Sequence, residues 1–363
     1  MKRLSILFIA LLMSGIYYSA DAQINRKKIR KNNKRISTFK GKKTFFAKEK
    51  RYNWLAISLN TFNYFGDLAP LNKTASTDFS FTSPAVGVMF GHRFGPFYTL
   101  RASFTYGTLK GEDAASADPN DANAVSRYVR NLSFRNRIKE LTVVGVFDLF
   151  KNESTYISRV QWTPYAFTGV TVFHHNPQAQ APEFDLNNNP LPEAGEWVDL
   201  QPLGTEGQYA DLQEGDANAG IEPYKRLQIA IPLGIGIRYR LNQVFDLSLE
   251  TSFRFLFTDY IDDVSQNYVD LGVFEGDELA KAMSYRSGEL IGNETNENAA
   301  AILNGQPHIY NGRDGQSYSV LRGYGSEDIQ NLRGGRDQND MYFVTTIKMA
   351  YIIGATFRRA KFR

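Results

Sequence analysis

The strongest constraint on the fold is an alternating pattern between residues 227 and 257. Apolar side chains occupy every second position before Asn242 and again after Gln243. Successive side chains of a strand point to opposite faces, so the pattern predicts two strands joined by a turn of about two residues. Both strands exceed the usual length of about five or six residues, and an apolar face along a whole strand is typical of a barrel wall in lipid.

Similar alternation marks eight stretches of the chain, near residues 53–65, 85–94, 98–107, 138–150, 162–174, 227–241, 245–257 and 341–357. The connections between them are alternately long (67–83, 110–133, 175–224, 258–339) and short. The sequence therefore predicts an all-β fold, an eight-stranded antiparallel transmembrane β-barrel over residues 52–358. Because such barrels have short periplasmic turns, we expect long extracellular loops and both termini in the periplasm.

A soluble eight-stranded barrel, with the apolar face turned inward around a ligand, is the alternative. The lipid-facing arrangement is favoured by aromatic residues near strand ends, such as Phe94, Tyr98 and Phe257, and by the unequal loops. The polar face is rich in Gly, Ala and Ser, which suits a narrow, filled lumen.

The chain begins with features of a signal peptide. Lys2 and Arg3 precede an apolar run, and residues 19–22 end in an A-x-A pattern, so we expect residues 1–22 to be removed.

Residues 23–51 hold 13 Lys or Arg against Glu49 alone and are expected to form a disordered basic periplasmic arm. Residues 359–363 form a short basic tail. The arm's docking candidates for an acidic partner or an anionic polymer are Arg26, Lys27, Lys28, Arg30, Lys31, Lys34 and Arg35. A solvated tether is the alternative.

Charged residues of both signs lie on the predicted inner face. They are Arg93, Arg101, Glu140, Arg238, Arg240, Asp246, Glu250, Arg254 and Lys348. Buried charges are stable only when paired, and eight strands enclose room for side chains but no wide channel. We therefore expect a plug-like charge network, with a narrow ion pathway as the alternative.

Two loop motifs carry acidic groups. Asp185, Asn187, Asn189 and Glu196 have calcium-loop spacing, but Pro190 replaces the required glycine, which makes a calcium site a weak candidate beside a polar outer loop. The second motif follows the seventh predicted strand and contains Asp259, Asp262, Asp263 and Asp270. A solvated loop with turn-forming aspartates is the favoured interpretation, and a cation site or partner contact is the alternative.

The sequence predicts no catalytic residue, no metal site and no cofactor. It contains no cysteine, and the adjacent pair His174-His175 points to opposite faces of a strand. Gly234-Ile235-Gly236 lacks the third glycine and the helix of a dinucleotide site. A membrane-embedded hydrolase is the least favoured class, because His92 has no nearby serine.

Several segments resemble a known family. They are NYFGDLAP (63–70), RNRIKEL and VVGVFDLF (135–150), WTPYAFTGVTVFHHNP (162–177), FTDYIDDVSQNYVD (257–270) and RGGRDQNDMYF (333–343). Together they resemble the PorG-like outer-membrane β-barrel family of Bacteroidota, which is associated with the type IX secretion system. The resemblance implies a non-enzymatic barrel that contacts periplasmic secretion proteins. From the barrel pattern itself we expect outer-membrane lipids around the protein, and outside the cytoplasm we expect no nucleic-acid partner. The long basic arm and the two large loops depart from that family, so a paralogue with another envelope task is an alternative. A surface-exposed binding or narrow transport barrel that acts through acidic loops is a further alternative.

Overall fold

The computed structural model describes residues 50–68, 81–292, 294–305, 307–336 and 339–353. The expected signal peptide (1–22), the arm up to residue 49 and the basic tail (359–363) lie outside the described residues. So do the last four residues, 354–357, of the eighth predicted strand.

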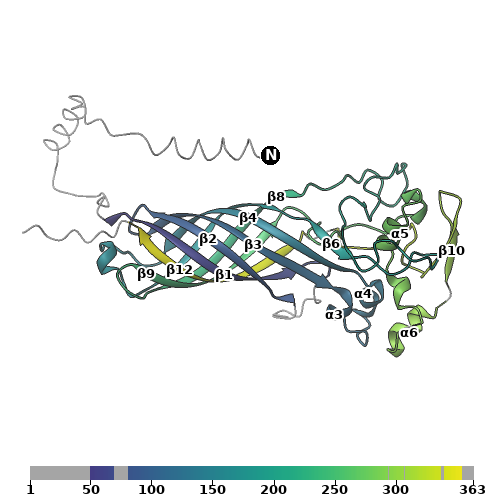
Figure 1. Ribbon diagram of the computed structural model, residues 1–363, viewed down its shortest axis with the longest axis horizontal. Coiled ribbons are helices and arrows are strands. Elements are labelled where there is room, and N and C mark those ends of the chain that lie inside the picture. Colours follow the sequence, from purple (N-terminus) through teal and green to yellow (C-terminus); the bar gives the residue numbers. More distant parts are fainter. Residues whose placement is uncertain (1–49, 69–80, 293, 306, 337–338, 354–363) are drawn as a thin grey trace, which may run out of the picture. The chain divides into compact units, whose positions relative to one another are not determined.

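Eight long strands form a closed antiparallel barrel (Figure 1). Each pairs with the next long strand along the chain, and the last pairs with the first, with Asn53 opposite Ile353 and Phe65 opposite Met341. The predicted all-β, eight-stranded barrel is confirmed. The strands are β1 (Asn53–Phe65), β2 (Ser83–Arg93), β3 (Tyr98–Glu112), β4 (Ser133–Asp148), β5 (Trp162–His174), β8 (Leu227–Arg240), β9 (Phe245–Leu256) and β12 (Met341–Ile353).

The outer wall of the barrel is apolar. On β8, Leu233 and Ile235 are 53% and 66% exposed to solvent, whereas Ala230 on the opposite face is buried. Exposing apolar surface to water costs about 25 cal/mol per Å², so a wall of this kind is stable only against lipid. The barrel is therefore of the outer-membrane type. Among the described residues, no helix is long and apolar enough to cross a membrane.

One hairpin extends further than the sequence predicts. β3 continues to Glu112 and β4 begins at Ser133, and these two residues pair with each other. The outward side chains of this extension include Lys110 and Glu112, both exposed. Its outer face is therefore charged and suits water, unlike the apolar outer face of the rest of the barrel. The expected loop 110–133 is shortened accordingly and contains α3 (Asp113–Ser116) and α4 (Val125–Arg130).

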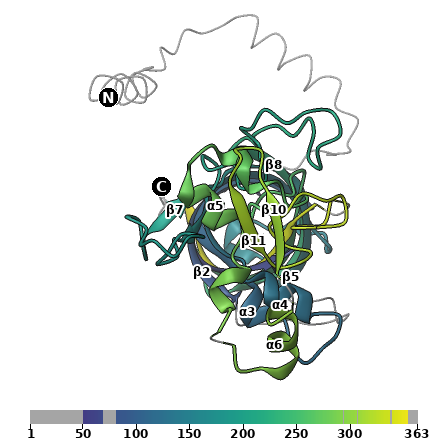
Figure 2. The same ribbon diagram turned by 90° about the vertical axis from the view of Figure 1, so that its right-hand side faces the viewer.

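The connections at the end of the barrel that carries the long loops fold into a cap, defined as the described part of residues 113–132, 175–226 and 257–340. Figures 1 and 2 show α5, β10 and β11 across this end, which we call the long-loop end. The opposite end is the short-turn end. Besides α3 and α4, the cap contains β6 (Pro177–Gln180), β7 (Trp197–Asp199), η4 (Leu271–Phe274), α5 (Glu278–Ser284), η5 (Ser287–Leu290), α6 (Glu297–Leu303), β10 (His308–Asn311) and β11 (Ser317–Val320).

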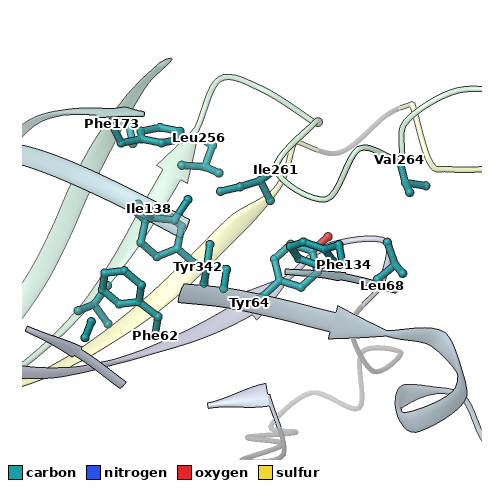
Figure 3. Close-up of a cluster of buried hydrophobic side chains, with 14 of the residues drawn as sticks. Phe62, Tyr64, Leu68, Phe134, Ile138, Phe173, Leu256, Ile261, Val264 and Tyr342 are labelled. Atoms are coloured by element: carbon teal, nitrogen blue, oxygen red, sulfur yellow. The ribbon is translucent and has the colours of Figure 1, made fainter. Parts of the chain in front are cut away.

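Apolar side chains pack inside the barrel at both ends. At the long-loop end, strand residues pack against Leu68, Ile261 and Val264 from the loops (Figure 3). The strand side chains of this upper cluster include Phe62, Tyr64, Phe134, Ile138, Phe173, Leu256 and Tyr342. At the short-turn end, the lower cluster contains Tyr52, Trp54, Ala56, Met89, Ala350 and Ile352. Charged side chains around Glu140 and Glu250 lie between these clusters, and further charged side chains lie beside the lower cluster: Asp246 pairs in register with Ala350, and the Arg93 amide donates to the Tyr52 carbonyl oxygen.

Candidate functional site

Glu250, on β9, is the centre of the charged layer in the lumen. Its Oε1 accepts hydrogen bonds from Arg101 Nη1 at 2.5 Å and Tyr165 Oη at 2.6 Å, and also from Lys348 Nζ. All four side chains are buried. The donors come from β3, β5 and β12, so one carboxylate joins side chains from four strands of the wall.

A glycine on β8 makes room for this centre. Gly236 lies in register between Tyr165 on β5 and Glu250 on β9. A Cβ atom at residue 236 would lie 2.7 Å from the Tyr165 ring and 2.8 Å from Glu250 Cγ. Gly234 is similarly crowded, with Phe167 2.4 Å from the Cβ position. The Gly234-Ile235-Gly236 sequence therefore gives the lumen side chains space.

Glu140 organises the layer nearer the long-loop end. It accepts from Arg254 Nε at 3.3 Å and Nη2 at 3.1 Å, and from Tyr342 Oη at 2.7 Å. Arg254 also donates to Ser252 Oγ at 2.6 Å. A planar guanidinium bound at two nitrogens is held in orientation as well as paired in charge.

Two further carboxylates organise the layer nearer the short-turn end. Asp148 accepts from Arg93 Nη1 at 2.7 Å and from Arg238 Nη2 at 2.6 Å. Asp246 accepts from Arg159 Nη2 at 2.6 Å. Among the described lumen residues, six cations thus pair with four carboxylates. This arrangement fills the lumen with bonded side chains.

The structure brings eight of the nine predicted lumen charges into ion pairs. Seven are buried, and Arg238 is half-buried but bound to Asp148. Arg240 is the correction: it ends β8, is half-buried, and donates to the Ile157 carbonyl oxygen at 3.3 Å, with no carboxylate partner among the described residues. Alternation places Arg240 on the inner register, but the strand ends there and the guanidinium bonds the connection between β4 and β5.

Four members of the network are not among the predicted lumen charges: Asp148, Arg159, Tyr165 and Tyr342. Asp148 shares the register of Glu140 on the fourth predicted strand, so alternation would have been a sufficient signal for it. Arg159 lies in the connection between β4 and β5, where alternation carries no information. Tyr342 shares the register of Lys348, so alternation would have been a signal for it too. Tyr165 lies on a strand whose inner face also carries Phe167 and Phe173, so this face resembles a lipid-facing one in sequence.

The acidic segment after β9 is buried, which overturns the expected solvated loop. Asp262, Asp263 and Asp270 are at most 8% exposed, and Asp259 is half-buried. Asp270 accepts from the Gly272 amide at 2.9 Å and the Arg313 amide at 2.7 Å. These carboxylates bind backbone and side-chain donors of the cap, which a loop in water does not require.

Asp262 shares a tyrosine with Asp340, the residue before β12. Tyr64 Oη lies 2.6 Å from Asp262 Oδ2 and 2.9 Å from Asp340 Oδ1. The hydroxyl carries one proton, so it donates to one carboxyl group, and the other must donate a proton of its own. Burial and the proximity of the other carboxyl groups raise the pKa of Asp262 and of Asp340 well above the usual value. Burial also raises the pKa of Asp259 to about 8.

Asp263 has a positive φ of 69°, an uncommon backbone conformation for a residue other than glycine. Its carboxylate accepts from Tyr224 Oη at 2.5 Å and Thr205 Oγ1 at 2.6 Å, and its carbonyl oxygen accepts from Arg333 Nη1 at 2.7 Å. Arg333 also binds Glu206 at 3.0 Å. These bonds fix the two large loops to each other.

The two histidines at the end of β5 separate as expected. His174 is exposed, and His175 is fully buried, with its ring stacked on Tyr224 at 5.7 Å. Burial lowers the pKa of His175 to about 4, so this side chain is neutral at ordinary pH.

The weak calcium candidate has the bonding of a turn. Asp185 Oδ1 accepts from the backbone amides of Asn187 and Asn189 at 2.8 and 2.7 Å, and Glu196 is exposed. Within the part of the chain that the structure describes, no cluster of three or more His, Asp or Glu side chains is arranged to hold a metal ion. The docking candidates of the basic arm lie outside the described residues.

Residues 41–188 match the model of a family described as a domain of unknown function, DUF6089. No curated protein matches the sequence.

Solved structures similar to this chain include Ail, the attachment invasion locus protein of Yersinia pestis, in complex with the heparin analogue sucrose octasulfate. It is 7% identical, with 84% of this chain and 99% of that chain covered and a TM-score of 0.31. Neisserial surface protein A is 8% identical, with 82% and 96% covered and a TM-score of 0.33. A major outer membrane protein from Thermus thermophilus is 10% identical, with 83% and 99% covered and a TM-score of 0.34.

Proposed function

We propose that this protein is a non-enzymatic anchor in the outer membrane that serves as an accessory component of type IX protein secretion. The observation that carries the anchor role is the filled lumen. Paired charges occupy its middle and its short-turn end, and apolar clusters pack inside it at both ends. A barrel sealed in this way holds a position in the membrane and presents its two ends to other molecules.

The secretion role rests on the segments that resemble the PorG-like family, among them FTDYIDDVSQNYVD at residues 257–270. In this proposal the long-loop end faces the outside, and the termini and the short turns face the periplasm. The basic arm then docks periplasmic secretion proteins or an anionic envelope polymer through Arg26 and the neighbouring cations. Outer-membrane lipids surround the barrel, and nucleic acid has no part in the function.

Deleting residues 24–51 while keeping the signal peptide tests the docking role. The expected result is reduced cargo secretion and loss of periplasmic proteins that co-purify with the barrel. A matched control keeps the arm's length but replaces its seven candidate cations by glutamine, and it should reproduce the defect if charge is responsible. Unchanged secretion together with unchanged co-purification in the deletion would show that the arm does not dock partners.

A narrow transport barrel is the alternative that the lumen itself tests. Planar-bilayer recordings of the purified barrel are expected to show no conductance steps, because the six cations and four carboxylates of the lumen are bonded to one another. Steady ion conductance by the native chain would favour transport over anchoring.

A further inference from the structure

A pocket of about 500 Å³ opens at the short-turn end, between the β4–β5 connection and the β8–β9 turn. Ile157, Gln161 and the run of residues 240–244 line it. Its volume falls within the range of about 300–1,000 Å³ typical of small-molecule sites. No aspartate or glutamate is among the lining residues, so Arg240 gives the pocket a net positive charge.

Arg240 differs from the other cations on its register. Each predicted lumen cation apart from Arg240 binds a carboxylate. Among the described residues, the Arg240 guanidinium donates to the Ile157 carbonyl oxygen at 3.3 Å and to no carboxylate. The side chain is only half-buried at the mouth of the pocket. A guanidinium offers five N–H donors, so most of this group's bonding capacity remains available to a ligand.

Oxygen acceptors of the β8–β9 turn are occupied from within the protein. Arg159 Nη1 binds the Gln243 carbonyl at 2.9 Å, and Arg159 Nη2 lies 3.4 Å from the Asn242 carbonyl. Asn242 Oδ1 accepts from the Val244 and Phe245 amides, both at 2.9 Å. The lining thus combines one cation with the amide side chains of Gln161, Asn242 and Gln243 and with three aliphatic side chains. It suits a ligand that is anionic at one end and apolar at the other.

Aromatic residues indicate the depth of the pocket. Trp162 and Tyr239 are register partners on β5 and β8, and they are 50% and 49% exposed. Phe150 packs edge-on against Trp162 with ring centroids 5.7 Å apart. Exposed tryptophan and tyrosine of this kind mark the membrane–water interface. Gln161 and Arg240 are the next residues toward the turn, so the pocket lies at the level of the lipid headgroups.

We propose that this pocket binds the phosphate of a phospholipid in the inner leaflet of the outer membrane. Arg240 binds the phosphate oxygens, because a planar guanidinium can donate two parallel hydrogen bonds to a phosphate. Ile157, Leu241 and Val244 contact the glycerol and the first methylenes of the acyl chains. The assignment to the inner leaflet rests on the orientation given under the proposed function, whereas the binding chemistry does not.

Titration of the purified full chain with dioleoylphosphatidylglycerol, followed by native mass spectrometry, tests the site. Arg240→Gln is expected to weaken retention of the tightest-bound lipid by roughly tenfold, and Arg240→Lys to weaken it less. Arg322→Gln is the matched control, because Arg322 is an exposed cap arginine at the other end of the barrel. It should bind lipid like the native chain. Heat-modifiable gel migration of each variant verifies that the barrel is folded.

Two further arms identify the ligand. Dioleoylglycerol, which lacks the phosphate, should not be retained, and millimolar inorganic phosphate should not displace the phospholipid. Equal retention of dioleoylglycerol, displacement by free phosphate, or equal losses in Arg240→Gln and Arg322→Gln would each overturn the proposal. The titration is done in detergent and is independent of orientation, so a reversed orientation in cells would refute that part of the proposed function and leave the site intact.

Discussion

At the residue scale, the stability of the lumen depends on a few carboxylates that each hold more than one donor. Glu250 holds a lysine, an arginine and a tyrosine, and Asp148 holds two arginines. Burying an ion pair contributes little net stability, but removing one partner leaves an uncompensated charge in a medium that solvates it poorly. Substitution of the shared carboxylate should therefore have a larger effect than substitution of any single surface charge.

Glu250→Gln is expected to lower the free energy of unfolding by about 3–5 kcal/mol, because Arg101 and Lys348 lose their carboxylate while remaining buried. Urea unfolding in lipid vesicles, followed by tryptophan fluorescence, measures the change. Glu153→Gln is the control, because the Lys151–Glu153 pair is exposed and surface pairs contribute little. If Glu250→Gln unfolds at the same urea concentration as the native chain, the shared carboxylate is not a stabilising centre.

The acidic groups of the cap make its stability depend on pH. The pKa of Asp259 is raised to about 8 by burial, so between pH 4 and 8 the folded cap binds more protons than the unfolded cap. The contribution of Asp259 to the stability of the folded cap is then fully present below about pH 4, and it is lost as the pH rises through 8. Asp259 Oδ2 has no hydrogen-bond partner among the described residues, and Ser265 bonds the same carboxyl group. Asp259→Asn removes the charge while keeping an oxygen that can accept from Ser265.

We therefore expect the ratio of protease cleavage rates in the cap, native chain over Asp259→Asn, to rise between pH 6 and pH 9. Taking the ratio at each pH cancels the pH dependence of the protease itself. A constant ratio would mean that Asp259 does not govern the opening of the cap over this range.

At the element scale, short helices and loops of the cap are held together by buried arginines. Arg130, on α4, binds Asp113 at 2.7 and 2.8 Å and donates to the carbonyl oxygens of Asp67, at 2.9 Å, and of Arg333. These partners belong to three different connections between strands. A helix of six residues has little stability of its own, so such tertiary bonds hold it in place.

Arg130→Gln is expected to increase protease cleavage within residues 257–340 while the barrel keeps its heat-modifiable migration. The physical reason is that the cap loses bonds to three connections, whereas the strand pairing is untouched. Arg313→Gln is the control, because Arg313 is bound to Asp216 at the surface. Equal cleavage of the two variants would contradict a special role for Arg130.

At the scale of the whole molecule, the two ends of the barrel differ in kind. The long-loop end carries the cap, and the short-turn end carries three brief connections and the proposed lipid pocket. Because the chain contains no cysteine, single cysteines can report which end faces outward. Ser319 on β11 and Ser154 in the β4–β5 connection are both exposed.

In intact cells, a membrane-impermeant maleimide is expected to label Ser319→Cys, and to label Ser154→Cys only after the outer membrane is permeabilised. The reverse pattern would invert the proposed orientation. The native chain, without a thiol, gives the background signal.

The sequence alone determined the barrel and most of its lumen, because the two faces of a strand are encoded by local alternation. A period of two places Leu233 and Ile235 on one face and Glu250 and Arg254 on the other without knowledge of the neighbouring strands. Aromatic residues near the strand ends and the unequal loops indicated which face is outside. The alternation of short and long connections led to the expected orientation, with both termini in the periplasm, which stays a prediction.

Only the tertiary structure decided what the loops do and where the inner register ends. From the sequence, Asp262 is expected to be a solvated turn residue. In the structure it is buried, and Tyr64, which is distant in sequence, bonds both Asp262 and Asp340. Arg240 continues the inner alternation, but its strand ends there, next to the register partners Trp162 and Tyr239, and its guanidinium bonds the β4–β5 connection and no lumen carboxylate among the described residues. Burial in a cap and depth in a membrane depend on contacts between distant segments, and a local pattern of residues carries no information about them.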